Sequence, residues 1–252
     1  MVKKSIYCIL LLLSALFLAN RQTCAASKDK PNVILIYADG FGKGLLSAYG
    51  QKHFTTPNID GLVNNGVSFD YAYGGAASAY SRASLLTGYM DNSKNRWRIT
   101  NGGVYMKEDT THLHQNEDFI DGNSILLPEN DLYLPQVFRK AGYVTGEIGV
   151  LEWGNTSSRR QLAQHGWDYY FGYLDHIRSR GYYPPFLFEN GQIVMLEGNT
   201  RLDCGVNYEP ENENAYNRRW DMKGKEVYAP ALFVDKIIEF MREFKDIPFF
   251  LI

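Results

Sequence analysis

The sequence is poor in cysteine and has no excess of either charge. Its 252 residues include three cysteines, and only Cys204 lies outside the amino-terminal leader. One cysteine cannot form an internal disulfide, which excludes the small disulfide-stabilised scaffolds and requires an ordinary hydrophobic core. Lysine and arginine total 26 against 28 acidic residues, with no basic block. This balance argues against a nucleic-acid-binding function.

Residues 1–26 have the pattern of a secretory signal peptide. Two lysines precede an apolar run from Ile6 to Ala19, and small residues follow at Cys24-Ala25-Ala26. The run is too short for a membrane span, and a lipid anchor at Cys24 is the weaker alternative. We expect an exported protein, periplasmic or secreted, with no membrane segment after cleavage and one domain over residues 27–252.

The order of the predicted elements indicates an α/β fold. The apolar run Asn32–Ala38 is typical of a central parallel strand covered on both faces. Residues Leu132–Ala141 predict a helix that Gly142 ends, and Tyr143–Val150 predicts the next strand. We therefore expect an α/β protein with a mainly parallel central sheet flanked by helices.

Four further segments complete the expected architecture. Thr56–Gly66 predicts a helix with proline at its first position, and Val67–Phe69 predicts a short strand. Pro230–Phe244 predicts a helix, and Pro248–Ile252 predicts a buried strand. An apolar strand at the end of the chain would leave a hydrophobic edge exposed, so we expect poor solubility.

Candidate chemistry is concentrated in Ser78–Gly88, which predicts a short helix that begins at a nucleophile. Ser78 would lie among unpaired N–H groups at the helix start, where anions bind. Arg82 would share its face and reach the same anionic ester, although a serine-rich cap with an exposed arginine fits equally. Asp39 follows the first strand, where open α/β sheets place ligands, or it caps the turn.

Two other groups of residues have weaker functional interpretations. His112 and His114 are candidate metal ligands, but no third ligand stands at a recognisable spacing, in a stretch expected to be a long surface excursion. The aromatic residues between Trp167 and Pro185 would suit a carbohydrate-facing cleft, although packing alone explains them.

Taken together, these segments closely resemble the sulfatases, arylsulfatase-like enzymes of the alkaline phosphatase superfamily. The resemblance covers nearly all of residues 27–252 and corresponds to the N-terminal part of a family member. It implies an alkaline phosphatase-like sulfatase fold that is incomplete at the C-terminus. The matching segments are Pro31–Asp39, Thr56–Asp60, Ser78–Gly88, Ala141–Gly146 and Gly166–Leu174.

The resemblance implies a sulfuric ester hydrolase acting on a sulfated carbohydrate or an aryl sulfate ester. A formylglycine-generating maturase would oxidise Ser78, and the hydrated aldehyde would attack the ester while bound to calcium or magnesium. Arg82 would hold that aldehyde, and both Asp39 and Ser78 would be metal ligands. A divalent cation and basic donors suit a reaction in which negative charge moves onto sulfate.

Several residues depart from the family pattern. Gly40 replaces the second of two adjacent aspartates, so we expect calcium or magnesium to bind weakly if at all. Tyr80 stands where the maturation signal has proline or alanine. Val150 and Glu152 replace the lysine and histidine of a Gly-Lys-x-His-x-Gly motif, and Arg180 replaces a further histidine.

Three functions remain open at this point. The chain is a sulfatase that tolerates these substitutions, a sulfatase-like binding protein or truncated relic without turnover, or a phosphatase or phosphodiesterase that uses unmodified Ser78. Each lost proton-transfer group costs roughly 10²–10⁴-fold in rate, which favours the second. The third needs a metal site rich in aspartate and histidine, which these residues do not supply.

Overall fold

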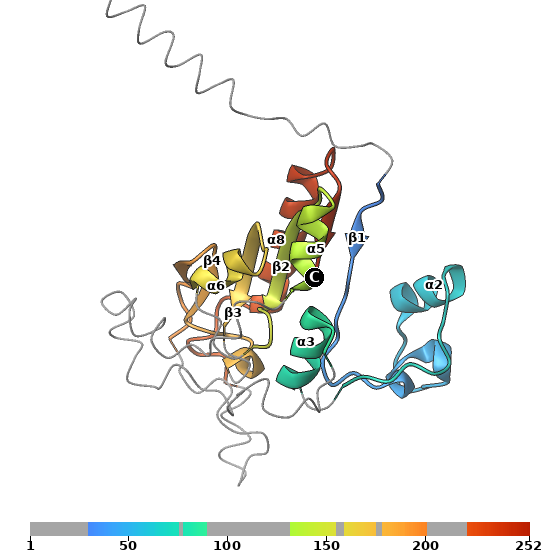
Figure 1. Cartoon of the computed structure of the whole chain (residues 1–252). Coiled ribbons are helices and arrows are strands. Elements are labelled where there is room, and N and C mark those ends of the chain that lie inside the picture. The colour runs from blue at the N-terminus through green and yellow to red at the C-terminus, as the bar shows by residue number, and fades with distance from the viewer. Residues whose placement is uncertain (1–29, 76–77, 90–131, 155–158, 175–177, 201–220) are drawn as a thin grey trace, which may run out of the picture.

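A computed structural model describes residues 30–75, 78–89, 132–154, 159–174, 178–200 and 221–252 (Figure 1). The predicted leader, Cys204 and the candidate ligands His112 and His114 lie outside these residues. Within the described part of the chain, no helix combines the length and the apolar character that crossing a membrane requires.

A mixed sheet of six strands forms the centre of the described chain. Its first four strands in spatial order are parallel, and the last two form an antiparallel hairpin. The predicted α/β class with a mainly parallel sheet is confirmed, whereas the strand Tyr169–Tyr173 and the antiparallel hairpin were not predicted. In spatial order the strands are β1 (Val33–Ile34), β6 (Phe249–Leu251), β2 (Val144–Val150), β3 (Tyr169–Tyr173), β4 (Phe186–Glu189) and β5 (Gln192–Met195).

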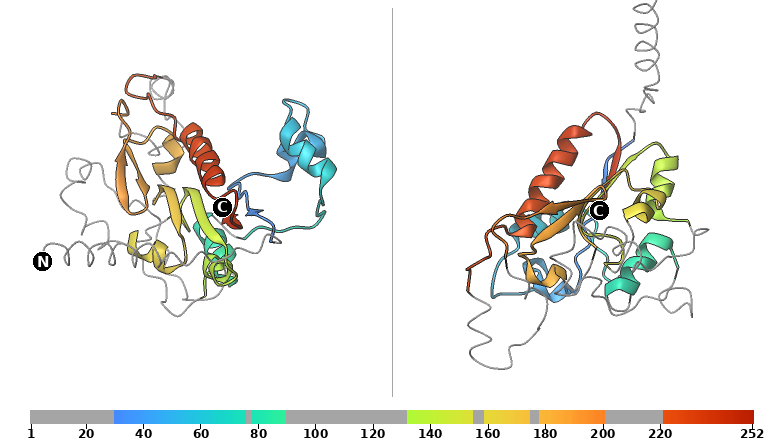
Figure 2. Two further views of the ribbon diagram at one scale, coloured as in Figure 1. Left: turned by 90° about the horizontal axis from the view of Figure 1, so that it is seen from above. Right: turned by 90° about the vertical axis from the view of Figure 1, so that its left-hand side faces the viewer.

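Helices cover both faces of this sheet. In the right-hand view of Figure 2, α8 lies on one face, and α5 and α6 lie on the other. The predicted helices are confirmed within a residue or two at their ends, and α6 was not predicted. The described helices are α2 (Pro57–Asn65), α3 (Ser78–Thr87), α5 (Leu134–Lys140), α6 (Arg159–Gln164) and α8 (Ala229–Glu243), with 3-10 turns η1 (Lys43–Leu45), η2 (Ser47–Tyr49) and η4 (Arg178–Gly181).

Strand β6 is an interior strand and is buried on both faces. Phe250 stacks on Phe138 of α5 with ring centroids 3.9 Å apart, and Phe249 meets Phe240 of α8 edge-on. The backbone pairs with β1 on one side and β2 on the other. The prediction of an exposed edge at this strand is therefore wrong, because two neighbouring strands satisfy its backbone hydrogen bonds. The expectation of poor solubility, which depended on that edge, loses its basis.

Strand β1 is the edge of the described sheet. Val33 and Leu35 pack against the core, whereas Ile34 and Ile36 are 50% and 79% exposed. The predicted central strand with two covered faces is wrong for the described chain, because β6 pairs with β1 from one side. Only Val33–Ile34 of the predicted run form a strand, which pairs in parallel with β6, as Val33 lies opposite Phe250.

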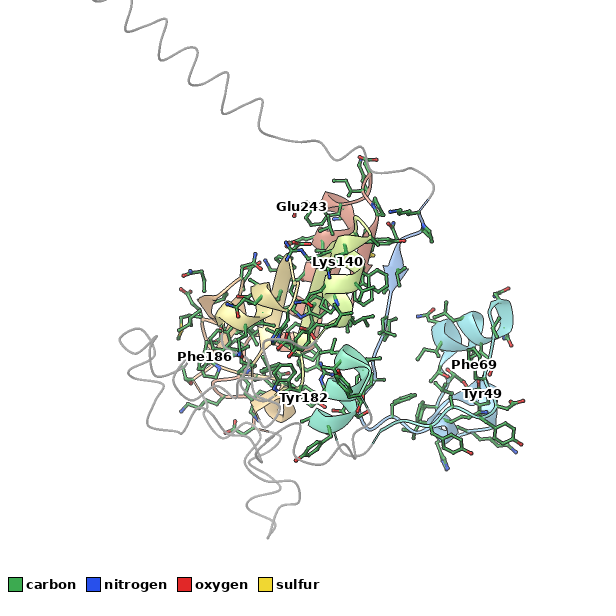
Figure 3. All side chains as sticks on the ribbon, viewed as in Figure 1. Tyr49, Phe69, Lys140, Tyr182, Phe186 and Glu243 are labelled. Carbon is green, nitrogen blue, oxygen red and sulfur yellow. The ribbon has the colours of Figure 1, made fainter. Side chains whose placement is uncertain are left out.

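Residues 41–73 form a small helical lobe that projects away from the sheet, with Tyr49 and Phe69 labelled in Figure 3. Helix α2 begins at Pro57 as predicted, and the Thr56 hydroxyl bonds to Asp60 and Ser47 at 2.8 and 2.9 Å. The predicted strand Val67–Phe69 is wrong, because the segment is exposed and pairs with no strand of the described sheet.

Candidate functional site

The segment that follows β1 meets the first half of α3 through Tyr37. Its hydroxyl lies 2.7 Å from Ser81 Oγ, and the Arg82 guanidinium lies 5.3 Å from the centre of its ring. Asp39, two residues beyond Tyr37, occupies an exposed turn that continues at Gly40. The structure thus brings the segment that ends at Asp39 to the helix that begins at Ser78.

Helix α3 is anchored by its small and aliphatic face. It begins at Ser78 and ends at Thr87 as the sequence predicts, and the N–H of Gly88 donates to Ser84 at 2.8 Å. Gly88 has φ +73°, a left-handed conformation that favours glycine after a helix. Its buried aliphatic residues are Ala79, Ala83 and Leu86. The helix is fixed in place, while the side chain of Ser78 lies outside what the structure describes.

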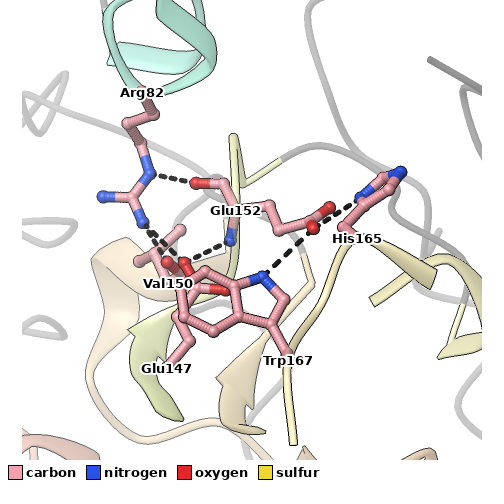
Figure 4. Close-up of polar contacts among 6 residues, drawn as sticks. All are labelled: Arg82, Glu147, Val150, Glu152, His165 and Trp167. Atoms are coloured by element: carbon pink, nitrogen blue, oxygen red, sulfur yellow. Dashed lines mark hydrogen bonds and ion pairs between the residues drawn. The ribbon is translucent and has the colours of Figure 1, made fainter. Parts of the chain in front are cut away.

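Arg82 is buried, and its guanidinium is held by backbone (Figure 4). Its Nε donates to the carbonyl of Glu152, and its Nη2 donates to the carbonyl of Val150. The alternative of an exposed arginine beside a helix cap is therefore wrong. These bonds join α3 to the segment after β2, so Arg82 ties together two elements far apart in sequence.

Glu147 lies next to Arg82, in the middle of β2, and is fully buried. Its Oε1 accepts the Glu152 N–H at 2.8 Å and lies 3.9 Å from Nη2 of Arg82. Burial, and then the Glu152 charge, raise the pKa of Glu147 to about 8, against the lowering effect of Arg82. Burial and Glu152 therefore favour the protonated form of this carboxyl, whereas Arg82 favours its charged form.

Glu152 directs its carboxylate into the core. Its Oε1 accepts from Nδ1 of His165 at 2.6 Å and from Nε1 of Trp167 at 3.3 Å. His165 also stacks on Tyr133, with ring centroids 3.9 Å apart. Glu152 has φ +48°, a conformation that costs energy for a residue with a side chain. The acceptor role of its carboxylate holds the turn in this shape.

A family model described as Sulfatase matches residues 31–252. This chain belongs to the sulfatase family. A curated N-acetylgalactosamine-6-O-sulfatase of Bacteroides thetaiotaomicron is 33% identical over 193 residues, which cover 73% of this chain and 33% of that relative. Human arylsulfatase D is 32% identical over 178 residues, which cover 64% of this chain and 26% of that relative. The chain therefore spans a third or less of these two curated relatives.

Solved structures show the same fold. A structure from work on glycosaminoglycan metabolism by Bacteroides thetaiotaomicron matches with a TM-score of 0.60 at 24% identity. The match covers 89% of this chain and 50% of that one. The sulfatase resemblance stated from the sequence is confirmed, including its restriction to part of a longer family member.

The described residues do not fit the divalent cation that the sulfatase family implies. Asp39 supplies one carboxylate, and Gly40 at the next position supplies none. The space beside Gly40 is open, because a Cβ added there would meet no atom within 4 Å. Nowhere in the described segments do three or more histidine, cysteine, aspartate or glutamate side chains gather as a metal site. Calcium takes six to eight oxygen ligands, so the donors described around Asp39 are too few.

The structure adds two residues that sequence analysis missed, namely Glu147 and His165. Trp167, which was named only as part of an aromatic stretch, is buried and donates to Glu152. One signal was present, because a glutamate within the otherwise uncharged strand Val144–Val150 needs a buried partner. Arg180, which replaces a family histidine, lies in η4, and its side chain is not among those described. Tyr80, in the first turn of α3, is partly buried and packs against the core.

Proposed function

We propose that this sulfatase-family chain does not turn over sulfate esters. The observation that carries the proposal is the position of Arg82, whose guanidinium is buried and bonded to two backbone carbonyls. Sulfate ester hydrolysis needs cationic donors aimed at the oxygens where charge develops. An arginine whose donors already serve the carbonyls of residues 150 and 152 has to break those bonds to act on a sulfate.

Glu152 supports the same proposal. It stands where the family resemblance has a histidine, and its carboxylate accepts from His165 and Trp167. A carboxylate in this position stabilises the turn after β2 and offers no cation to an anionic ester. Two positions that the family uses for chemistry therefore contribute to the core in this chain.

We further propose that the ligand class is a sulfated carbohydrate, bound without hydrolysis by the exported protein. The relative from Bacteroides thetaiotaomicron is named for a sulfated amino sugar, which supports a sugar ligand ahead of an aryl sulfate. A working sulfatase with formylglycine at Ser78 is the second candidate. It is favoured by the retained contact of Tyr37 with Ser81, which keeps Asp39 and Ser78 on adjoining segments.

Mass spectrometry of the peptide that contains Ser78 separates the two candidates. The chain is expressed in a host whose formylglycine-generating maturase converts a co-expressed active sulfatase, which is the positive control. We expect Ser78 to stay unmodified, because Tyr80 replaces the proline or alanine of the maturation signal. The matched variant Tyr80→Ala tests that cause, and its conversion is expected. An aldehyde at Ser78 in the wild-type chain contradicts the proposal.

A further inference from the structure

We propose that Arg82, Glu147 and Glu152 form a proton-operated switch, in which loss of a proton from Glu147 opens the 150–154 turn and releases Arg82. In Figure 4 the Glu147 carboxyl lies between the guanidinium and the backbone of that turn. This switch is separate from sulfate ester chemistry, and its test does not depend on the proposed function.

The geometry favours a neutral Glu147. Its side chain is 2% exposed, and Oε2 has no hydrogen-bond partner among the described residues, so a negative charge on this carboxyl would be poorly solvated. Arg82 lies at 3.9 Å, too far for a strong charge-assisted bond, and it already donates to two carbonyls. The Glu152 carboxylate is a second negative charge in the same buried cluster.

The elements packed around Glu147 supply few positive charges that could stabilise its ionised carboxylate. Arg82 comes from α3, and Tyr170 of β3 is the residue paired with Glu147 in the sheet. Helix α5 also packs on β2, and its charged residues Arg139 and Lys140 are exposed. Helix α8 covers the opposite face, where a Cβ on Gly146 would meet Phe240 at 2.7 Å. Of the described residues, Arg82 is therefore the positively charged group within reach of Glu147. The Glu152 carboxylate repels a negative charge on Glu147.

The 150–154 turn is the element that can move. Glu152 and Gly154 have φ +48° and +64°, so the turn contains one strained residue that is held by its hydrogen bonds. A charge on Glu147 would be relieved by admitting water, which requires this turn to leave its place. Its departure takes the carbonyls of Val150 and Glu152 away from Arg82. Trp153, fully buried in the turn, would then become exposed.

The direction of the pH dependence follows from the pKa of Glu147. That pKa is about 8 in the folded chain and about 4.5 ordinarily, so between these values the folded state binds a proton that the unfolded state does not. Stability from this group is fully present below pH 4.5 and is lost as the pH rises through 8. For one proton, the unfolding equilibrium constant rises roughly tenfold per pH unit within this window.

The test compares the wild-type full chain with Glu147→Gln, which imitates the neutral carboxyl. Intrinsic tryptophan fluorescence of the native protein is followed from pH 6 to 9, and urea unfolding is measured at the same pH values. We expect a red shift with a midpoint near pH 8 in the wild type and none in Glu147→Gln. The variant is also expected to lack the tenfold-per-unit increase in unfolding.

The control is Glu239→Gln, which removes an exposed carboxylate of α8 and should behave as the wild type. An identical red shift in Glu147→Gln overturns the switch. If that variant does not fold, infrared spectroscopy of the wild-type chain decides. A protonated carboxylic acid band at pH 7 that disappears above pH 8 supports the switch, because ordinary carboxyls are ionised at pH 7. Absence of the band at pH 7 overturns it.

Discussion

Replacing Arg82 by methionine is expected to lower the free energy of unfolding by about 3–5 kcal/mol. Methionine keeps much of the aliphatic volume but removes both donors. The carbonyls of Val150 and Glu152 would then lose their partners, and the Glu147 carboxyl would lose the guanidinium that lies 3.9 Å from its Oε1. Each buried polar group left without a partner costs about 1–3 kcal/mol. Urea unfolding at pH 7 measures the difference.

Arg139→Met is the matched control for that experiment. Arg139 forms an ion pair with Asp168 at 3.2 Å, but both side chains are partly exposed. Such a pair contributes about 0–1 kcal/mol, so the control should unfold close to the wild type. Equal, small losses in the two variants would show that Arg82 is not a structural residue, and would return it to the role that the family resemblance implies.

Replacing Glu152 by alanine is expected to cost about 3 kcal/mol of stability, because two donors lose their common acceptor. Nδ1 of His165 and Nε1 of Trp167 would be left without the carboxylate oxygen they now share. The φ of +48° adds backbone strain that no side-chain contact would then offset. Thermal unfolding followed by near-ultraviolet circular dichroism reports both the stability and the packing of Trp167.

Glu152→Gln is the matched variant, because its amide oxygen can take the place of the oxygen that both donors share but carries no negative charge. We expect it to lose about half as much stability as the alanine variant. If alanine and glutamine variants are both as stable as the wild type, the carboxylate does not hold the turn. The interpretation of position 152 as a structural residue would then fail.

Local sequence signals predicted helices α2, α3, α5 and α8 and the interior strands β2 and β6, but not the interior strands β3 and β4. Gly88 and Gly142 both have positive φ at the ends of helices, as the sequence indicated. Strand β2 was predicted within one residue of its observed bounds. These features depend on near neighbours in the chain, where capping, glycine conformation and hydrophobic periodicity act directly.

The features that sequence analysis missed depend on contacts between distant residues. Strand β3 lies in the aromatic stretch between Trp167 and Pro185, and the β4–β5 hairpin follows directly after that stretch. Neither was predicted, because local patterns do not specify strand partners. Arg82 bonds to carbonyls 68 and 70 residues further along the chain, and backbone acceptors leave no mark in the side-chain sequence. The exposure of β1 also depends on a distant part of the chain, because β6 is its neighbour in the described sheet and leaves its other edge unpaired there.

The central claim, that Arg82 and Glu152 serve the core rather than sulfate chemistry, is tested most directly by sulfate release. The full chain, co-expressed with a maturase and supplied with calcium, is assayed on N-acetylgalactosamine 6-sulfate and on an aryl sulfate. We predict no release above that of Ser78→Ala on either substrate. Sulfate release by the wild-type chain that disappears in Ser78→Ala would contradict the claim.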